Sequence, residues 1–162
     1  MASYLSTERP RLRPWAESDV DEYRALVTER GNGVPSVATI QERITAQLAA
    51  TAETGIALLP ICRHLEGDFI GYCGLVIGRS SLDEPEVAYE LFQQAHGHGY
   101  ASEAARAVLD AAIATGRKRL WATVGRWNTP SLRVLEKLGF RRDHVTTKDD
   151  GDELVWLTRV LP

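Results

Sequence analysis

The chain has 162 residues, close to the roughly 150 residues of one domain, and this predicts a single domain over residues 1–162. Its 19 Lys and Arg against 22 Asp and Glu give a net charge of −3, which disfavours nucleic acids and anionic membranes as partners. With 44% hydrophobic and 25% charged residues, the composition is that of a globular domain. No apolar run has the length of a membrane span, and residues 1–14 lack the apolar segment of a signal peptide, so a cytoplasmic location is expected.

The N-terminal third combines an extended start with helices. Residues 11–15 are expected to be extended. Ser18 is the predicted N-cap of a first helix, because an acidic residue follows at the third helical position. After a Gly- and Pro-containing loop over residues 29–36, a second helix is predicted to begin near Thr39, again on a capping-box pattern.

The middle of the chain has the pattern of three antiparallel strands. Residues 56–64 and 69–77 are predicted to form a hairpin, with Pro60 at a bulge or on an unpaired side. Residues 86–92 alternate, which predicts Glu86, Ala88 and Glu90 on one face and Val87, Tyr89 and Leu91 on the other. Cys62 and Cys73 form no metal or disulfide motif and are expected in the core.

The C-terminal half begins with a helix that has a regular apolar face. Its members are Ala101, Ala104, Ala105, Val108, Leu109 and Ala112. A strand over residues 120–124, a helix over residues 131–138 ended by Gly139, and a closing hairpin of residues 145–147 and 154–161 follow. Trp121, Trp127 and Trp156 are expected in the core. This order of elements predicts a mixed α/β fold with a central strand–helix–strand crossover.

A glycine-containing loop joins the strand over residues 86–92 to the Ala-rich helix. Gly97 and Gly99 allow backbone conformations that bring a ligand close to the amides, and the N–H groups at the helix start favour an anion such as pyrophosphate. The Gly-x-Gly pattern alone also fits a simple turn. A dinucleotide fingerprint is excluded because position 102 is Ser, and the phosphate loop of nucleotide hydrolases is excluded because no Gly-Lys-Ser/Thr follows.

Two motifs resemble those of the GCN5-related N-acetyltransferase (GNAT) superfamily. Gln94-x-x-Gly97-x-Gly99, followed by Tyr100-Ala101-x-Glu103-Ala104, resembles its acyl-CoA signature. Residues 128–140 are similar to the N-x-x-S-x-R-V-x-E-K-x-G-F stretch of the subgroup that contains the ribosomal-protein N-terminal acetyltransferases. Residues 7–15 are similar to that subgroup's first strand, so the resemblance covers nearly the whole chain in order.

The resemblance implies a fold and an activity. The expected fold is a mostly antiparallel, twisted sheet of about six or seven strands, flanked by about four helices and splayed in the middle for acyl-CoA. The expected reaction is transfer of an acetyl group from acetyl-CoA to a primary amine by direct attack in a ternary complex, without a metal. The resemblance leaves monomer and homodimer open. It also leaves the acceptor open between a protein N-terminus, a lysine and a small amine.

The resemblance also implies which residues bind the cosubstrate. Backbone groups of Leu91, Phe92 and Gln93 would pair with the pantetheine arm as an added strand does. Amides of seven consecutive residues would hold the pyrophosphate: His96, Gly97, His98, Gly99, Tyr100, Ala101 and Ser102. Asn128 would hydrogen-bond the arm, while Arg133 either meets a phosphate or faces solvent. His96 and His98 lack a third ligand nearby and are expected to be loop positions, not metal ligands.

The catalytic residues are the most open part of the prediction. Many superfamily members carry Tyr where this chain has Leu135, so Ser131 is the expected acid or thioester-orienting group. A helix-start serine that bonds to the backbone is the alternative reading. Glu86 and Glu90 are candidates to take the proton of the amine, or else face solvent. The acceptor groove is expected between the loop over residues 29–36 and the hairpin near residues 148–153.

A second function class is compatible with the same motifs. The chain would then be a non-catalytic sensor or partner module that binds acyl-CoA on the same fold. Turnover of acetyl-CoA with an amine separates the two hypotheses.

Overall fold

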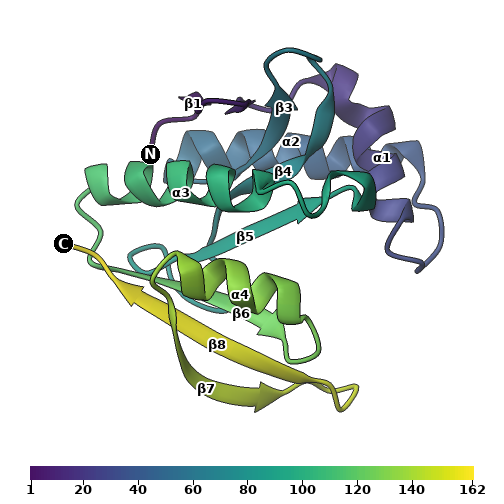
Figure 1. Cartoon of the computed structure of the whole chain (residues 1–162). Coiled ribbons are helices and arrows are strands. Elements are labelled where there is room, and N and C mark those ends of the chain that lie inside the picture. Colours follow the sequence, from purple (N-terminus) through teal and green to yellow (C-terminus); the bar gives the residue numbers. More distant parts are fainter.

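One eight-stranded sheet organises the molecule, with strand order β1-β2-β3-β4-β5-β6-β8-β7. The computed structural model describes residues 1–162 (Figure 1). The strands are β1 (Leu5–Ser6), β2 (Pro10–Leu12), β3 (Leu58–Arg63), β4 (Phe69–Val76), β5 (Glu86–Leu91), β6 (Arg119–Gly125), β7 (Arg141–Thr147) and β8 (Glu153–Val160). The helices are α1 (Val20–Thr28), α2 (Val37–Thr54), α3 (Tyr100–Ala114) and α4 (Thr129–Lys137), with 3₁₀ turns over Glu17–Asp19 and Gln93–Ala95.

The predicted mixed α/β class is confirmed, with one strand more than the upper expectation. The predicted extended segment over residues 11–15 is in a strand only at its start, in β2, and a further short strand, β1, precedes it because the chain reverses where the Thr7 N–H donates to the Pro10 carbonyl over 3.0 Å. Every neighbouring pair is antiparallel except β5 and β6, which lie on either side of the α3 crossover. No helix has both the length and the apolar character needed to cross a membrane.

Pro60 lies inside β3, a strand that is paired on both sides. Its carbonyl accepts the Arg13 N–H over 3.3 Å, just beyond the end of β2. Because the N–H and C=O of one strand residue point to the same side, the N–H that proline lacks also faces this strand end. Of the two predicted settings, the structure supports the bulge, because a register shift lies between Ile61 and Cys62, close to Pro60, whereas the side that Pro60 faces is paired with β2 and Arg13.

Both early helices begin at residues other than those predicted. The expected cap at Ser18 is wrong, because Arg13 holds the Asp19 carboxylate with two 2.8 Å hydrogen bonds while this carboxylate accepts the Ala16 N–H. A 3₁₀ turn therefore precedes α1. The start of α2 is also earlier than expected, since Ser36 Oγ accepts the Thr39 N–H over 3.1 Å.

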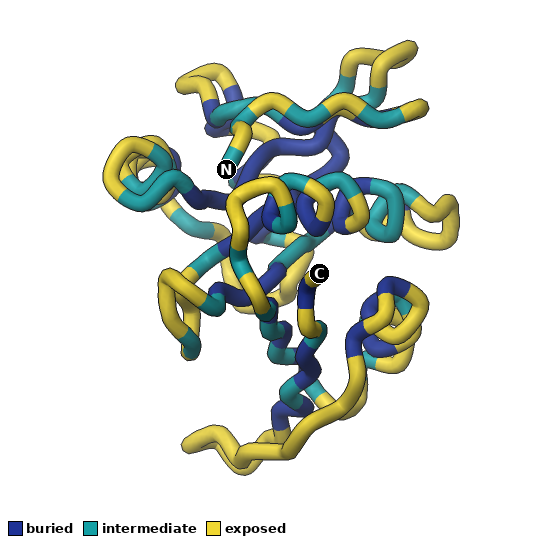
Figure 2. The backbone as a smooth tube through the Cα atoms, turned by 90° about the vertical axis from the view of Figure 1, so that its left-hand side faces the viewer, coloured by how far each residue is buried: buried dark blue, intermediate teal, exposed yellow.

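Helices cover both faces of the sheet. On one face α3 and α4 pack over a core of 25 buried residues, and on the other α1 and α2 pack over a core of 10 (Figure 1). Residues Ala104, Ala105, Val108, Leu109 and Ala112 of α3 are all buried, as their spacing predicted. Cys62 and Cys73 are also buried. By contrast, β7 is exposed along its whole length (Figure 2).

The sheet opens between its two parallel strands. β5 and β6 are paired only at Glu86 and Trp121, near the beginning of both strands. Beyond this point they diverge, and α4 follows β6 on the far side of the opening (Figure 1). The splayed centre expected from the resemblance is therefore present.

Candidate functional site

The opening exposes one backbone edge of β5. The Phe92 N–H donates to the Ile70 carbonyl of β4 over 3.0 Å. Because successive strand residues direct their backbone groups to opposite sides, Tyr89 and Leu91 direct theirs away from β4, into the opening. The C-terminal half of β5 therefore offers an unpaired strand edge.

This geometry narrows the expected pairing over residues 91–93. Both backbone groups of Phe92 have partners in the chain, since its carbonyl also accepts the Ala95 N–H over 2.9 Å. The Gln93 N–H donates to the Glu29 carboxylate over 3.4 Å. Of the three predicted residues, Leu91 alone faces the opening with its N–H, and Tyr89 is the neighbour that the sequence reading missed.

The loop after β5 ends in a row of free backbone donors. The N–H groups of Gly97, His98, Gly99, Tyr100, Ala101 and Ser102 have no hydrogen-bond partner within the chain. The His96 N–H differs, because it donates to the Gln93 carbonyl over 3.0 Å and is not available to a ligand. No side chain caps α3 at its N-cap, Gly99. Six adjacent unpaired donors at the positive end of a helix dipole have the geometry to bind an anion.

The backbone conformation favours glycine at two positions of this loop. Gly97 has φ +79° and Gly99 has φ +81°, in the left-handed region. A Cβ at Gly97 would meet no atom within 4 Å, whereas a Cβ at Gly99 would lie 3.3 Å from Nη2 of Arg9. The constraint at Gly97 is therefore conformational, and at Gly99 a steric contact adds to it.

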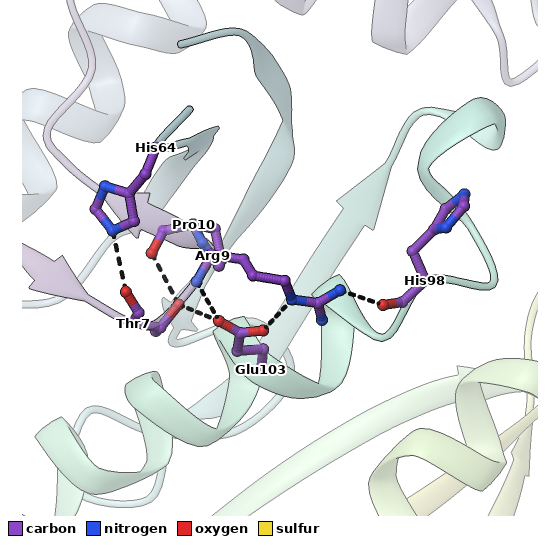
Figure 3. A network of polar contacts seen from close by, with 6 residues as sticks. All are labelled: Thr7, Arg9, Pro10, His64, His98 and Glu103. Atoms are coloured by element: carbon purple, nitrogen blue, oxygen red, sulfur yellow. Dashed lines mark hydrogen bonds and ion pairs between the residues drawn. The ribbon is translucent and has the colours of Figure 1, made fainter. Parts of the chain in front are cut away.

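A polar network ties the loop to the N-terminal strands (Figure 3). Glu103 in the first turn of α3 accepts hydrogen bonds from the Thr7 hydroxyl, the Arg9 N–H and Arg9 Nε. Nη1 of Arg9 donates to the His98 carbonyl over 2.8 Å, and its guanidinium lies 4.5 Å from the centre of the Tyr100 ring. The Arg9 side chain thus holds the loop through a backbone carbonyl of the loop. Burial opposes ionisation of Glu103, but the hydrogen bonds from Thr7 and Arg9 prevail and lower its pKa.

The remaining loop side chains make few contacts. Nε2 of His96 lies 3.0 Å from the Leu91 carbonyl, which ties the loop to the end of β5. The exposed His98 ring lies 6.0 Å from the Tyr100 ring, and Gln94 is exposed without a hydrogen bond in the chain. No group of three or more His, Cys, Asp or Glu residues has the arrangement of a metal site.

The start of α4 faces the opening from the other side. Oδ1 of Asn128 accepts the Ser131 N–H over 3.3 Å, which caps the helix and leaves the amide nitrogen of Asn128 without a partner in the chain. Arg133 is exposed and forms no ion pair. Asn128 therefore caps α4, and a contact with the cosubstrate arm, as predicted, would use its free amide nitrogen.

Ser131 and Tyr89 meet across the opening. The hydroxyl groups of the two residues are 2.7 Å apart, and the Tyr89 hydroxyl is also 3.3 Å from the Ser131 carbonyl. The alternative in which the Ser131 side chain bonds to the backbone is not what the structure shows. Burial raises the pKa of Tyr89 to about 12, although the hydrogen bond to Ser131 opposes this rise. The strand alternation predicted the face of Tyr89 but gave no sign of its partner.

Glu90 and Glu86 share a face of β5, as predicted, and both are engaged within the chain. Arg30 and the Tyr72 hydroxyl donate to Glu90, with a Tyr72–Glu90 distance of 3.0 Å. The hydrogen bonds that Arg30 donates to Glu90 raise the pKa of Arg30, and burial raises the pKa of Tyr72. Glu86 is only 4% exposed and accepts from the Thr123 hydroxyl over 2.6 Å and from the Arg79 N–H.

The tryptophans differ from the expectation of core residues. Trp127 is 77% exposed, and Trp121 and Trp156 are only partly buried, in contact with the exposed His144. For Trp121 and Trp156 the reason is that α4 covers only the other face of β6 and β8.

Shallow depressions lie at both expected rims of the acceptor groove. One lies beside Glu29, and the other is lined by Arg79 and residues 148–150.

Sequence comparisons extend over most of the chain. The family described as "Acetyltransferase (GNAT) domain" matches residues 9–141. The uncharacterized N-acetyltransferase p20 of Bacillus licheniformis is 31% identical over 147 residues, 86% of this chain and 83% of that protein. The uncharacterized protein YkkB of Bacillus subtilis is 36% identical over 75 residues, 45% of this chain and 44% of YkkB.

Solved structures share the whole fold. An acetyltransferase from Agrobacterium tumefaciens is 28% identical and superposes with a TM-score of 0.80, covering 98% of this chain and 95% of the other. The structure of RimL, described as a ribosomal L7/L12 alpha-N-protein acetyltransferase in complex with coenzyme A, is 14% identical with a TM-score of 0.84 over 98% of both chains. The family match and the splayed sheet with its loop of free amides lead to one conclusion: this chain belongs to the GNAT family of acetyltransferases.

Proposed function

We propose that this chain transfers the acetyl group of acetyl-CoA to a primary amine, by direct attack of the amine in a ternary complex. The observation that carries the proposal is the row of six unpaired amides from Gly97 to Ser102, next to the unpaired edge of β5. A pyrophosphate satisfies such donors, and an extended arm pairs with such an edge. Backbone donors also suit a chain with a net charge of −3, because they bind an anion without a cluster of basic side chains.

Each binding residue has a defined part in this proposal. The amides of Gly97 to Ser102 hold the pyrophosphate, and the Leu91 N–H pairs with the pantetheine arm together with Tyr89. The free amide nitrogen of Asn128 donates to the same arm from the opposite side. Arg133, exposed and without an ion pair, is available to a phosphate. The thioester of acetyl-CoA supplies an acyl group that is already activated for attack.

Glu86 and Glu90 already have hydrogen-bond partners within the chain, and this supports an acceptor amine of low pKa, which needs little help to lose its proton. At pH 7 about a tenth or more of an α-amine with a pKa of about 7.7–8.0 is neutral, against roughly one part in 2,500 of a lysine side chain with a pKa of about 10.4. An acceptor that is already partly neutral needs little help from a carboxylate. The acceptor we propose is therefore the α-amine of a peptide or a small amine of similar pKa, which agrees with the description of RimL as an alpha-N-protein acetyltransferase.

Exchange of either carboxylate tests proton removal. For the proposed α-amine, Glu90→Gln and Glu86→Gln are expected to lower kcat only modestly at pH 7, and less still at pH 9, because most of an α-amine is already neutral at the higher pH. The measurement is kcat at saturating acetyl-CoA and acceptor over this range. An equal loss at both pH values contradicts a role of that carboxylate in taking the proton.

The decisive experiment combines binding and turnover. Acetyl-CoA is expected to raise the Tm of the protein, whereas ATP and NAD are not. Release of free CoA is then followed with peptides that have free N-termini, with the same peptides carrying blocked N-termini and a lysine, and with small amines. Preferential acetylation of the free α-amine supports the proposal, and acetylation confined to lysine contradicts the proposed acceptor.

A non-catalytic acyl-CoA sensor is the second candidate. The observation in its favour is that both carboxylates near the opening already have partners, Glu90 with Arg30 and Glu86 with Thr123. The sensor predicts tight binding of acetyl-CoA without turnover of any amine in the panel. Turnover of one acceptor at a rate that depends on Ser131 rules it out.

A further inference from the structure

The contact between Tyr89 and Ser131 joins the two halves of the splayed sheet. Tyr89 belongs to β5, and its side chain lies with the core beneath α3 and α4. Ser131 lies in the first turn of α4, beyond the point where β5 and β6 separate. The 2.7 Å distance between their hydroxyls is therefore set by how far the sheet opens.

Tyr89 is the residue that fixes the Ser131 side chain. The Tyr89 hydroxyl is the one hydrogen-bond partner of Ser131 Oγ in the chain. A helix-start serine usually bonds instead to nearby backbone. Here the Ser131 N–H is already occupied by Asn128, and the side chain is directed to β5. Without the phenol, Ser131 Oγ would be free to turn to another rotamer.

The number of hydroxyl hydrogens determines which of the two residues can donate into the opening. One hydrogen lies between the two oxygens, so Ser131 can donate its own hydrogen into the opening only when Tyr89 donates to Ser131 Oγ. A phenol is a better donor than an aliphatic alcohol because it is the stronger acid. Its raised pKa of about 12 keeps the phenol protonated at neutral pH. The Ser131 carbonyl, 3.3 Å away, is a second acceptor for the same phenol hydrogen, and the shorter 2.7 Å contact favours donation to Ser131 Oγ, which leaves the Ser131 hydrogen free to point into the opening.

We propose that Tyr89 is a positioning residue that orients the Ser131 hydroxyl toward the thioester sulfur; this inference rests on the proposed acetyl transfer. The amine nitrogen forms the new N–C bond and the C–S bond breaks, with its electron pair remaining on sulfur. The Ser131 hydroxyl stabilises that charge by a hydrogen bond. The proton lost by the amine balances the proton that the released thiolate takes up, so Tyr89 and Ser131 end the cycle unchanged.

A double-mutant cycle tests this positioning role. Tyr89→Phe is expected to lower kcat about tenfold, the equivalent of one hydrogen bond, with little change in KM for acetyl-CoA. Ser131→Ala is expected to lower kcat at least as much. Tyr89→Phe added to Ser131→Ala is expected to have no further effect, because the phenol acts through the serine. The same loss in both backgrounds, or no loss in the wild-type background, overturns the proposal.

A matched control and an equilibrium measurement complete the test. Tyr23→Phe removes another buried tyrosine hydroxyl, on the opposite face of the sheet, and is expected to leave kcat unchanged. The ratio of the dissociation constants of acetyl-CoA and CoA is measured without any acceptor. Tyr89→Phe, Ser131→Ala and the double variant are expected to change this ratio by the same factor, about threefold. A ratio that Tyr89→Phe leaves unchanged overturns the proposal even if no amine is turned over, whereas absent turnover alone contradicts the proposed function.

Discussion

Gly97→Val is expected to weaken acetyl-CoA binding about 100-fold or more. Valine strongly disfavours the φ of +79° that Gly97 adopts, so the loop must change its path. Hydrogen bonds to a charged group contribute about 1.5–3 kcal/mol each, so loss of two from the six amides accounts for this factor. The measurement is the dissociation constant of acetyl-CoA by calorimetry.

Gly116→Val is the matched control for this substitution. Gly116 lies after α3, has φ +82°, and a Cβ there would meet no atom within 4 Å, as at Gly97. Both variants therefore introduce the same backbone conflict in open space, and both are expected to lose some Tm. Only Gly97→Val is expected to lose affinity. Full affinity in Gly97→Val, or an equal loss in Gly116→Val, refutes the assignment of the loop as the pyrophosphate site.

Glu103→Gln is expected to destabilise the fold by about 2 kcal/mol and to lower Tm by about 4–8 °C. The carboxylate accepts hydrogen bonds from both Thr7 and Arg9. The Gln side chain has only one acceptor oxygen, so its N–H₂ group faces one of these two donors and that hydrogen bond is lost. Arg9 then loses the partner that fixes it against the His98 carbonyl. Affinity for acetyl-CoA is expected to fall about fivefold, the equivalent of about 1 kcal/mol, because the loop is less well preorganised.

The stability difference between wild type and Glu103→Gln is expected to depend on pH. The pKa of Glu103 is lowered on folding from its ordinary value of about 4.5. A depressed pKa contributes stability that is fully present above the unfolded value and disappears as the pH falls through the folded value. Urea unfolding should therefore give the full difference at pH 6 to 7 and a shrinking one below pH 4.5.

An exposed ion pair provides the control for Glu103. Glu136 pairs with Arg142 over 3.0 Å, with both side chains about half exposed. Glu136→Gln is expected to change stability by less than about 0.5 kcal/mol and to leave acetyl-CoA affinity unchanged. Equal losses in the Glu103 and Glu136 variants would mean that the network in Figure 3 contributes no more than a surface contact.

Local patterns predicted those features whose cause lies within a few residues. The alternation over residues 86–92 placed Glu86 and Glu90 on one face of β5, and helical spacing gave the buried face of α3. The two glycines indicated the anion loop, since the conformation that they permit is a local property. The starts of α1 and α2 were predicted less well. Arg13 binds the Asp19 carboxylate before α1, and Ser36 caps α2, whereas the capping patterns assigned these caps to other residues.

The sequence by itself indicated the family, through the resemblance of its two motifs, and it determined the order of the elements and the glycine loop, which follow from short-range spacing. Only the tertiary structure decided which groups meet: Arg9 with Glu103 and His98, Arg30 with Glu90, and Tyr89 with Ser131. These pairs are separated by 42 to 94 residues in the chain. Their distances depend on how the sheet splays and how α3 and α4 pack on it, which no local pattern encodes.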